Sequence, residues 1–287
     1  MHMIEQCIKN TIGYFLSKHC IDNPIFIVGS GRSGTSVLLQ ALGKHDKIIA
    51  FPGEAPFLTT IGGSGSLLSS ENQQYYLSSL KISVNYFYNS LAKFGIESSG
   101  GENYALKEFA KSILRTKKIT LKKHWCAKTF PPESVAHGLA KVYPNAKFIY
   151  IVRNGIEVVH SMTKFHGFKQ NDFSKQCHIW SDSVEKYHYL HQWPNALCLR
   201  HEQLVHDPKT FFNGIFDFLD LQLNPDCIDF VSTNLIHPLD EPDQKQQDAI
   251  TQLKQRQSPF SNWPEEQKKI FESICSNSMQ LMNYPIE

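Results

Sequence analysis

The stretch that most limits the fold of this chain is IFIVGSGRSGTSVLLQAL, at residues 25–42. Four apolar residues come first, a glycine-rich loop follows, and an apolar segment with helical spacing comes last. A buried strand, a tight turn and a helix in direct succession are typical of α/β folds that place main-chain amides around a phosphate. The stretch therefore predicts a parallel sheet with an anion-binding loop after its first strand.

Segments with strand character alternate with segments of helical spacing along most of the chain. The expected strands are residues 25–28, 48–51, 125–127, 147–152 and 196–199, and the expected helices are residues 34–44, 133–142, 155–164, 208–219 and 264–282. Alternation of this kind is typical of parallel βαβ units. The chain is therefore expected to form a three-layer α/β/α fold around a central parallel sheet.

Length and composition fit one domain with an insertion. The chain has 287 residues, of which 41% are hydrophobic, and this is enough to bury a substantial core. A single domain is expected over residues 1–287, with its core in residues 24–55 and 124–287. Residues 56–123 are expected to be a helical insertion on the acceptor side, at the carboxyl edge of the sheet where open α/β sheets bind ligands.

Charge and cysteine content narrow the classes of partner and compartment. A net charge of +2 argues against a surface built for nucleic acid or for an anionic membrane. The seven cysteines are scattered, with no CxxC pair, which favours a reducing compartment over a disulfide framework or a zinc site. Residues 1–20 have helical spacing, and their apolar run is too short to span a bilayer. The expected location is cytoplasmic, unless a membrane anchor has been removed from the chain.

The loop GSGRSG at residues 29–34 fits two phosphate-binding patterns incompletely. It satisfies GxGxxG, and Glu54 follows at the distance of a ribose-binding acid, but a Pro-Gly pair separates Glu54 from the strand tip. It also nearly satisfies GxxxxGK[ST], but Thr35 replaces the lysine, and the strand KFIYIV ends in Arg153 instead of an aspartate. Main-chain amides, Arg32 and nearby hydroxyls can still hold one 5′-phosphate without a metal ion. A glycine turn without a ligand is the remaining alternative.

The stretch PIFIVGSGRSGTSVLLQAL resembles the 5′-phosphosulfate loop of sulfotransferases that use 3′-phosphoadenosine 5′-phosphosulfate (PAPS). The resemblance extends over most of the chain from Pro24 to about Tyr284, although residues 56–124 have no recognisable match. It implies a P-loop-like sulfotransferase fold. It also implies that the 5′ end of PAPS is bound by Gly31, Arg32, Ser33, Gly34, Thr35 and Ser36.

A second motif is AKFIYIVRNGIEVVHSM, at residues 146–162. Its strand ends at Arg153, and Ser161 follows about two turns along the next helix, so the two side chains can grip one phosphate. The pair is similar to the 3′-phosphate site of the family, which more often has Asp-Pro where this chain has Asn154-Gly155. Taken singly, Arg153 can also be a salt-bridge residue, and Ser161 a serine on a helix surface.

A third motif precedes the final helix. Arg256, Gln257 and Ser258 come shortly before Trp263, and this order resembles the late loop of the family, which closes over the 3′-phosphate. Gln257 and Ser258 stand where the family has lysine and glycine; a polar loop without a ligand is the alternative. The stretch LCLRHEQL is similar to the strand of the family that leads to a tyrosine near the adenine, with His201 at the tyrosine position.

The base of the cytosolic small-molecule branch is missing, because Phe130 in AKTFPP stands where those enzymes have histidine. The pair Gly53-Glu54 instead resembles tyrosylprotein sulfotransferases and related branches, which implies that Glu54 is the base; its apolar neighbours would raise its pKa. Lys128 is then implied as donor to the oxygen that bridges sulfate and 5′-phosphate, with Arg32 stabilising the same charge. Outside this family, a solvated or ion-paired carboxylate and an exposed lysine would explain both residues. Further candidates for acid–base work are His124, His160 and His166.

The resemblance implies a transferase that moves a sulfuryl group from PAPS to a hydroxyl by in-line displacement, giving PAP and a sulfate ester, with no metal ion. The acceptor can be a small molecule, a lipid, a glycan or a peptidyl tyrosine, and the oligomeric state is open. Two alternatives remain: a magnesium-dependent P-loop kinase and a module that binds PAP without catalysis.

Overall fold

The structure of the chain is a computed structural model that describes residues 23–54, 123–130, 133–235 and 257–286. The expected N-terminal helix, the insertion over residues 56–123 except its last residue, and Arg256 lie outside these ranges. The chain divides into two compact units. One comprises Met1–Ile27 and Leu42–Phe148, and the other comprises Val28–Ala41 and Ile149–Glu287.

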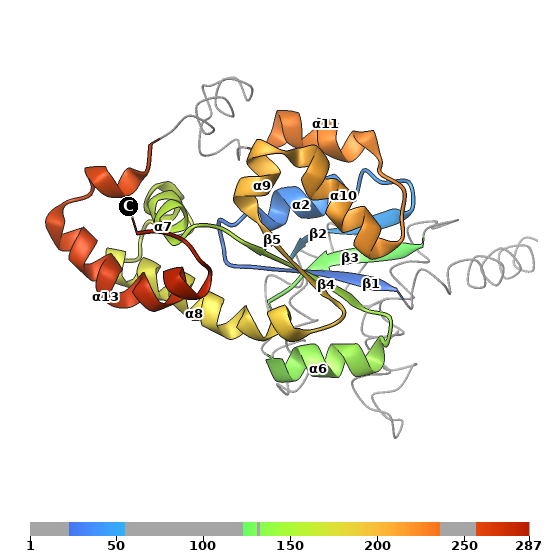
Figure 1. Cartoon of the computed structure of the whole chain (residues 1–287), viewed down its shortest axis with the longest axis horizontal. Helices are drawn as coiled ribbons and strands as arrows, with labels where there is room; N and C mark the ends of the chain where they lie inside the picture. Colours follow the sequence, from blue (N-terminus) through green and yellow to red (C-terminus); the bar gives the residue numbers. More distant parts are fainter. Residues whose placement is uncertain (1–22, 55–122, 131–132, 236–256, 287) are drawn as a thin grey trace, which may run out of the picture. The chain divides into compact units, whose positions relative to one another are not determined.

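Five strands form one parallel sheet that is flanked by helices, as the sequence predicts (Figure 1). Their order in the sheet is β2-β3-β1-β4-β5. The strands are β1 (Pro24–Val28), β2 (Ile48–Glu54), β3 (His124–Lys128), β4 (Lys147–Val152) and β5 (Ala196–Arg200). β1 is buried throughout, and β3 and β4 are buried after their first residue, whereas β5 at the edge is only half-buried. Central parallel strands covered on both faces need such continuous apolar runs.

The end of β2 differs from the sequence-based expectation. The four steps from Ala50 to Glu54 face only two steps on β3, from Cys126 to Lys128, so the register shifts between them. An irregularity of this kind lets a strand continue past Pro52, which has no N–H to donate. The prediction that the strand ends at residue 51 and that a Pro-Gly pair separates Glu54 from its tip is therefore wrong. Glu54 is the last residue of β2 and is in register with Lys128.

The helices confirm several expected boundaries and add elements that the sequence pattern did not predict. The expected α6 (Glu133–Val142), α7 (Gly155–Lys164) and α10 (Pro208–Leu219) have the expected limits. The first and last expected helices are slightly shorter, as α2 (Thr35–Leu42) and α13 (Glu265–Leu281). The additional elements are α8 (Phe173–Tyr187), α9 (His201–His206), α11 (Pro225–Asn234) and the 3₁₀ helices η3 (His188–Gln192) and η4 (Pro259–Asn262).

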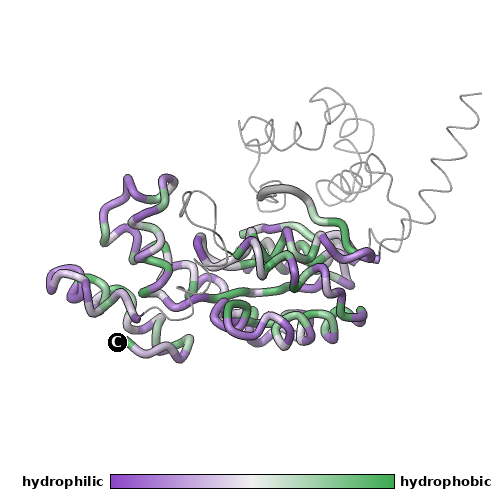
Figure 2. The backbone as a smooth tube through the Cα atoms, turned by 90° about the horizontal axis from the view of Figure 1, so that it is seen from above, coloured by the Kyte–Doolittle hydropathy of each residue, from purple (hydrophilic) through white to green (hydrophobic). Residues whose placement is uncertain are grey.

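Local sequence explains where the helices start. The Asp207 carboxylate accepts a hydrogen bond from the Thr210 N–H, and Pro208 occupies the first helical position of α10. The Asn224 side chain accepts from the Asp226 N–H at the start of α11 in the same way. A capping oxygen followed by proline satisfies the first amides and fixes the first φ. In Figure 2 the helices alternate hydrophobic and hydrophilic residues along their turns, as expected of helices with one buried face.

No helix within the described ranges has the length and apolar character that a membrane crossing requires.

Aromatic rings form the core of the first unit. Phe26 of β1 lies 5.6 Å from Trp125 and 5.2 Å from Phe148, and Trp125 lies 5.7 Å from Tyr143, measured between ring centroids. All four side chains are fully buried. Edge-on and tilted contacts between such rings stabilise a core beyond the area that they bury.

We expect Phe26→Ala to lower the free energy of unfolding by about 3–5 kcal/mol, because it opens a cavity among rings that cannot collapse inward. Leu281→Ala is a matched control, since Leu281 is 38% exposed on α13. It should lower stability by less than about 1 kcal/mol. Urea unfolding followed by circular dichroism measures both. Equal losses for the two variants would contradict the assignment of Phe26 to the core.

Candidate functional site

The glycine-rich loop connects β1 to α2 through an unusual backbone path. Arg32 has φ +68° and Gly34 has φ +86°. The Ser33 N–H donates to the Ser30 carbonyl at 3.3 Å, and the two serine hydroxyls hydrogen-bond to each other. Helix α2 then begins at Thr35, with its first amides unused by the helix itself. Because these amides form the positive end of a helix, the loop is suited to an anion.

Only glycine fits at position 34. A Cβ there would lie 2.6 Å from Cδ2 of His201, and the positive φ is one that larger residues rarely adopt. The left-handed conformation of Arg32, which has a side chain, is a strained feature, and such strain is often found at ligand sites.

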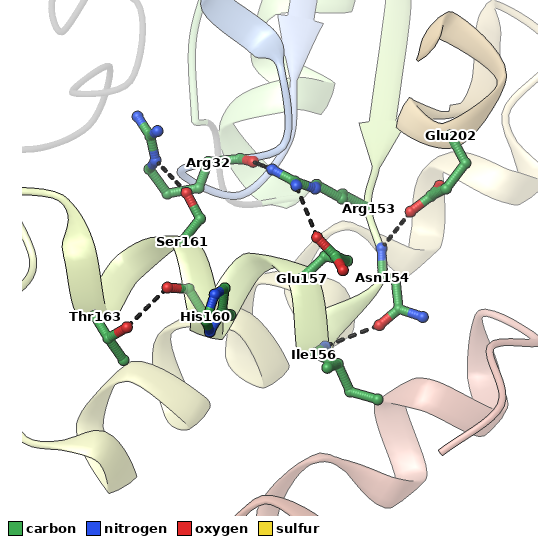
Figure 3. A network of polar contacts seen from close by, with 9 residues as sticks. All are labelled: Arg32, Arg153, Asn154, Ile156, Glu157, His160, Ser161, Thr163 and Glu202. Carbon is green, nitrogen blue, oxygen red and sulfur yellow. Dashed lines mark hydrogen bonds and ion pairs between the residues drawn. The ribbon is translucent and has the colours of Figure 1, made fainter. Parts of the chain in front are cut away.

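Arg153 connects the end of β4 to this loop (Figure 3). One nitrogen of its guanidinium donates to the Arg32 carbonyl at 3.1 Å, and another donates to the Glu157 carboxylate at 3.1 Å. Its side chain is only 12% exposed. An arginine placed in this way both holds the loop and brings a permanent positive charge to it. Arg153 does form an ion pair, as the alternative interpretation had it, but it also donates a hydrogen bond to the glycine-rich loop.

Ser161 of α7 lies at the same loop. Its hydroxyl accepts a hydrogen bond from Nε of Arg32 at 3.1 Å (Figure 3). The structure thus joins Arg32, Arg153 and Ser161 by hydrogen bonds within one compact unit. The sequence motifs predict that these three residues bind the two ends of one ligand.

Two residues that the sequence analysis did not assign to the site support the turn after Arg153. Glu202 accepts from the Asn154 N–H at 2.9 Å with one carboxylate oxygen, and from the Tyr284 hydroxyl at 2.8 Å with the other. Burial and the nearby Glu202 carboxylate raise the pKa of Tyr284, so its hydroxyl stays protonated and donates. The Asn154 side chain accepts from the Ile156 N–H and caps α7. These contacts fix the position of the turn behind Arg153.

The Asn-Gly sequence in that turn has a packing reason. A Cβ on Gly155 would lie 2.7 Å from the indole ring of Trp180, whose Nε1 donates to the Arg153 carbonyl at 3.1 Å. The indole of α8 therefore occupies the space that a proline ring would need. This explains why the turn departs from the more common Asp-Pro.

His201 is buried beneath the loop, against Gly34. Burial lowers its pKa well below the usual value, and the positive charges of Arg153 and Arg32 lower it further. The imidazole is therefore neutral near pH 7, and the local positive charge comes from the two guanidinium groups. The expectation that His201 lies near an adenine is not tested by this contact.

Glu54 and Lys128 belong to the other compact unit. They are the last residues of neighbouring strands and face each other in register. Lys128 is 8% exposed, and its Nζ lies 5.8 Å from the centre of the Phe130 ring. The alternative that Lys128 is a solvent-exposed lysine is therefore wrong. The roles of both residues in catalysis remain predictions.

The late loop is described only in part. Gln257 is exposed, and the Ser258 hydroxyl accepts from the Phe260 N–H at 3.4 Å, which caps η4. Trp263 packs edge-on against three phenylalanines, 5.1 Å from Phe173, 5.5 Å from Phe260 and 5.4 Å from Phe271. Since Arg256 is outside the described residues, phosphate binding by this loop remains a prediction.

The three further candidates for acid–base work, His124, His160 and His166, lie in different parts of the structure. His124 is the first residue of β3, at the opposite end of that strand from Lys128, and its Nδ1 lies 3.0 Å from the Asn23 carbonyl. The His160 carbonyl accepts from the Thr163 hydroxyl (Figure 3), and His166 is exposed beside Phe165. The described part of the chain contains no group of three or more His, Cys, Asp or Glu side chains that could hold a metal ion.

A family model described as the sulfotransferase family matches residues 24–225. The match covers well over half of the chain and includes the glycine-rich loop, Arg153 and Ser161. The chain therefore belongs to the sulfotransferase family.

Individual proteins with similar sequences are also named as sulfotransferases. A protein-tyrosine sulfotransferase of Drosophila melanogaster is 24% identical over 207 residues, which cover 70% of this chain and 38% of that protein. Protein-tyrosine sulfotransferase 1 of Danio rerio is 32% identical over 92 residues, which cover 30% of this chain and 26% of that protein. The chain spans about a quarter to a half of the length of the curated relatives that it matches.

Solved structures share the fold. The sulfotransferase domain of the Synechococcus PCC 7002 olefin synthase has a TM-score of 0.55 and 17% identity, over 91% of this chain and 93% of that one. The sulfotransferase domain from the curacin biosynthetic pathway has a TM-score of 0.54 and 18% identity, over 92% of this chain and 98% of that one. At these identities the likeness establishes the fold.

The buried His201 makes stability depend on pH. Because its pKa is lower in the folded chain than in the unfolded chain, only the unfolded chain takes up this proton just below pH 6.5. The free energy of unfolding should therefore fall with decreasing pH in this range, by at most about 1.4 kcal/mol per pH unit from this group.

His201→Gln should remove that part of the pH dependence, as measured by urea unfolding between pH 7.5 and pH 5. His206→Gln, at an exposed position on the same helix, should retain the wild-type slope. Identical slopes for His201→Gln and the wild type would show that His201 is not buried in its neutral form.

Proposed function

We propose that this chain transfers a sulfuryl group from PAPS to a hydroxyl acceptor and releases PAP and a sulfate ester. The observation that carries the proposal is the direct hydrogen bonding of Arg153 and Ser161 to Arg32 of the glycine-rich loop. A ligand whose anionic groups accept hydrogen bonds from residues of both motifs fits this arrangement. Adenosine phosphorylated at both its 3′ and 5′ positions is such a ligand.

The donor nucleotide would be held by two groups of residues. The loop amides and the start of α2 would bind the 5′-phosphate, since helix N-termini favour anions. Arg153 and Ser161 would bind the 3′-phosphate through charge-assisted hydrogen bonds. The residues assigned to the 5′ end are Gly31, Arg32, Ser33, Gly34, Thr35 and Ser36, and the late loop would add Arg256, Gln257 and Ser258 at the 3′ end.

The chemical step follows from the charges that develop during sulfuryl transfer. The acceptor oxygen forms a bond to sulfur while the bond between sulfur and the 5′-phosphate oxygen breaks, and the acceptor proton passes to the Glu54 carboxylate. Negative charge grows on the departing phosphate oxygen, where Lys128 and Arg32 would donate hydrogen bonds. The register of Glu54 with Lys128 supports a shared role for the two residues. The scheme uses no metal ion.

The acceptor class is proposed only as a hydroxyl. The named relatives are protein-tyrosine sulfotransferases, which supports a phenolic hydroxyl among the candidates. Alcohols of small molecules, lipids and glycans remain in the same class, because nearly all of residues 56–123, where we expect acceptor specificity, lies outside the described part. The cytoplasmic location stays a prediction.

Arg153→Ala should discriminate between nucleotides that differ by one phosphate. We expect the Kd for PAP to rise by about 10- to 100-fold, because a charge-assisted contact to the 3′-phosphate is lost. The Kd for adenosine 5′-monophosphate, which has no 3′-phosphate, should rise by a clearly smaller factor, because this nucleotide loses only the support that Arg153 gives the loop through the Arg32 carbonyl. Isothermal titration calorimetry measures both, and circular dichroism reports whether the variant is folded. Equal losses for the two nucleotides would contradict the assignment of Arg153 to the 3′ end.

Glu54→Gln and Lys128→Ala should each lower kcat by about 100-fold or more, since the first removes the base and the second a donor to the leaving group. Both variants should still bind PAP. Glu185→Gln and Lys209→Ala, at exposed helical positions, are matched controls that should retain wild-type turnover. The assay follows PAP release from PAPS with a panel of phenols and alcohols.

Thermal shifts with PAP, ATP-Mg and NAD separate this proposal from its alternatives, because the stabilisation by a ligand follows its affinity. A dominant shift with ATP-Mg would favour a kinase, and one with NAD would favour a dinucleotide fold. PAP binding that coexists with no turnover of any acceptor, in the wild type and in both variants, would favour a module without catalysis.

A further inference from the structure

The connection between α7 and α8, at residues 165–172, places two aromatic rings on the glycine-rich loop. The centre of the Phe165 ring lies 4.1 Å from the guanidinium carbon of Arg32. The Phe168 ring lies against Gly31, where a Cβ would come within 2.8 Å of its Cζ atom. Neither phenylalanine belongs to the motifs found in the sequence.

One turn of α7 holds the Arg32 side chain from two directions. Phe165 ends the helix and donates its N–H to the Ser161 carbonyl at 3.1 Å, so the two residues are stacked one turn apart. The Ser161 hydroxyl accepts from Nε of Arg32, while the Phe165 ring faces its guanidinium. A hydrogen bond in one direction and a cation–π contact in another define the orientation of this planar group.

The connection itself is fixed by a buried amide. Nε2 of Gln176 donates to the Phe168 carbonyl at 3.1 Å and to the Asn171 carbonyl at 3.2 Å, and this side chain is 2% exposed. The Phe168 and Lys169 N–H groups both donate to the Phe165 carbonyl at 2.9 Å. The two rings are therefore held on the loop by a hydrogen-bonded turn, in addition to the packing of the rings.

We propose that Phe165 is a positioning residue for Arg32. Arg32 has a left-handed backbone and a long side chain with many rotamers, so its guanidinium needs outside contacts to point in one direction. A donor that is already oriented stabilises developing charge without reorganisation during the reaction. Phe165 provides this orientation, with Ser161 as the second contact and Gln176 holding the turn. The consequence for catalysis rests on the sulfuryl transfer proposed above.

The first test is independent of activity. The side-chain NMR signals of Arg32, assigned by their loss in Arg32→Lys, should be shifted upfield by the ring in the wild-type protein. The shift should disappear in Phe165→Leu and persist in Phe165→Tyr, which keeps the aromatic face. Arg32 signals at ordinary positions in the wild type would overturn the proposal.

The second test is kinetic. Phe165→Leu should lower kcat about tenfold, the value of one desolvated cation–π contact, and should change the KM for PAPS by less than about threefold. Phe165→Tyr should restore kcat to within about twofold of the wild type, a rescue that loss of bulk alone would not give. Phe230→Leu, a half-buried phenylalanine on α11, is the matched control and should keep wild-type kcat.

The outcomes distinguish a failure of the proposed function from a failure of the positioning role of Phe165. A wild-type protein without transfer from PAPS contradicts the proposed function, and the NMR shifts alone then decide whether Phe165 orients Arg32. Transfer that is unaffected by Phe165→Leu contradicts the positioning role while the proposed function stands. Equal losses in the leucine and tyrosine variants also contradict it, because the aromatic face would then be irrelevant.

Discussion

The hydrogen bond from the Arg153 guanidinium to the Arg32 carbonyl is the contact on which the candidate site depends. It ties the end of one central strand to the loop that follows another, and it fixes the loop at a residue in a left-handed conformation. The Glu157 carboxylate balances part of the arginine charge, and the buried His201 stays neutral beneath it. The loop therefore combines the first amides of α2 with two fixed guanidinium groups, an environment suited to an anion.

Contacts from neighbouring elements hold the turn after Arg153 and the side chain of Arg32 in position. Glu202 and the α7 cap hold the turn after Arg153, the Trp180 indole fills the space beside Gly155, and the α7–α8 connection covers the Arg32 side chain. These contacts come from helices α8 and α9 and from the end of the described chain, far apart in sequence. Much of the second compact unit thus supports the candidate site.

The parts of the fold with strong local signals could be predicted from the sequence. Continuous apolar runs marked the strands, and helical spacing marked α10 at its observed limits. Helix α8 was missed because its buried face includes two polar residues, Gln176, which donates to the preceding α7–α8 connection, and Ser181, which bonds the distant Ser278. The irregular end of β2 was missed for a related reason: Pro52 normally ends a strand, and only the pairing with β3 reveals that this one continues. In the site, motif spacing placed Arg32, Arg153 and Ser161, whereas Glu157 and Phe165 required the path of α7 in space.

The hydrogen bond from Tyr284 to Glu202 has a consequence for how the molecule is made. Glu202 and Tyr284 are 82 positions apart in the sequence, so the support behind the Asn154 turn cannot form until residue 284 has been synthesised. A chain interrupted before that residue would keep Arg153 and the glycine-rich loop but would lack this contact behind the turn.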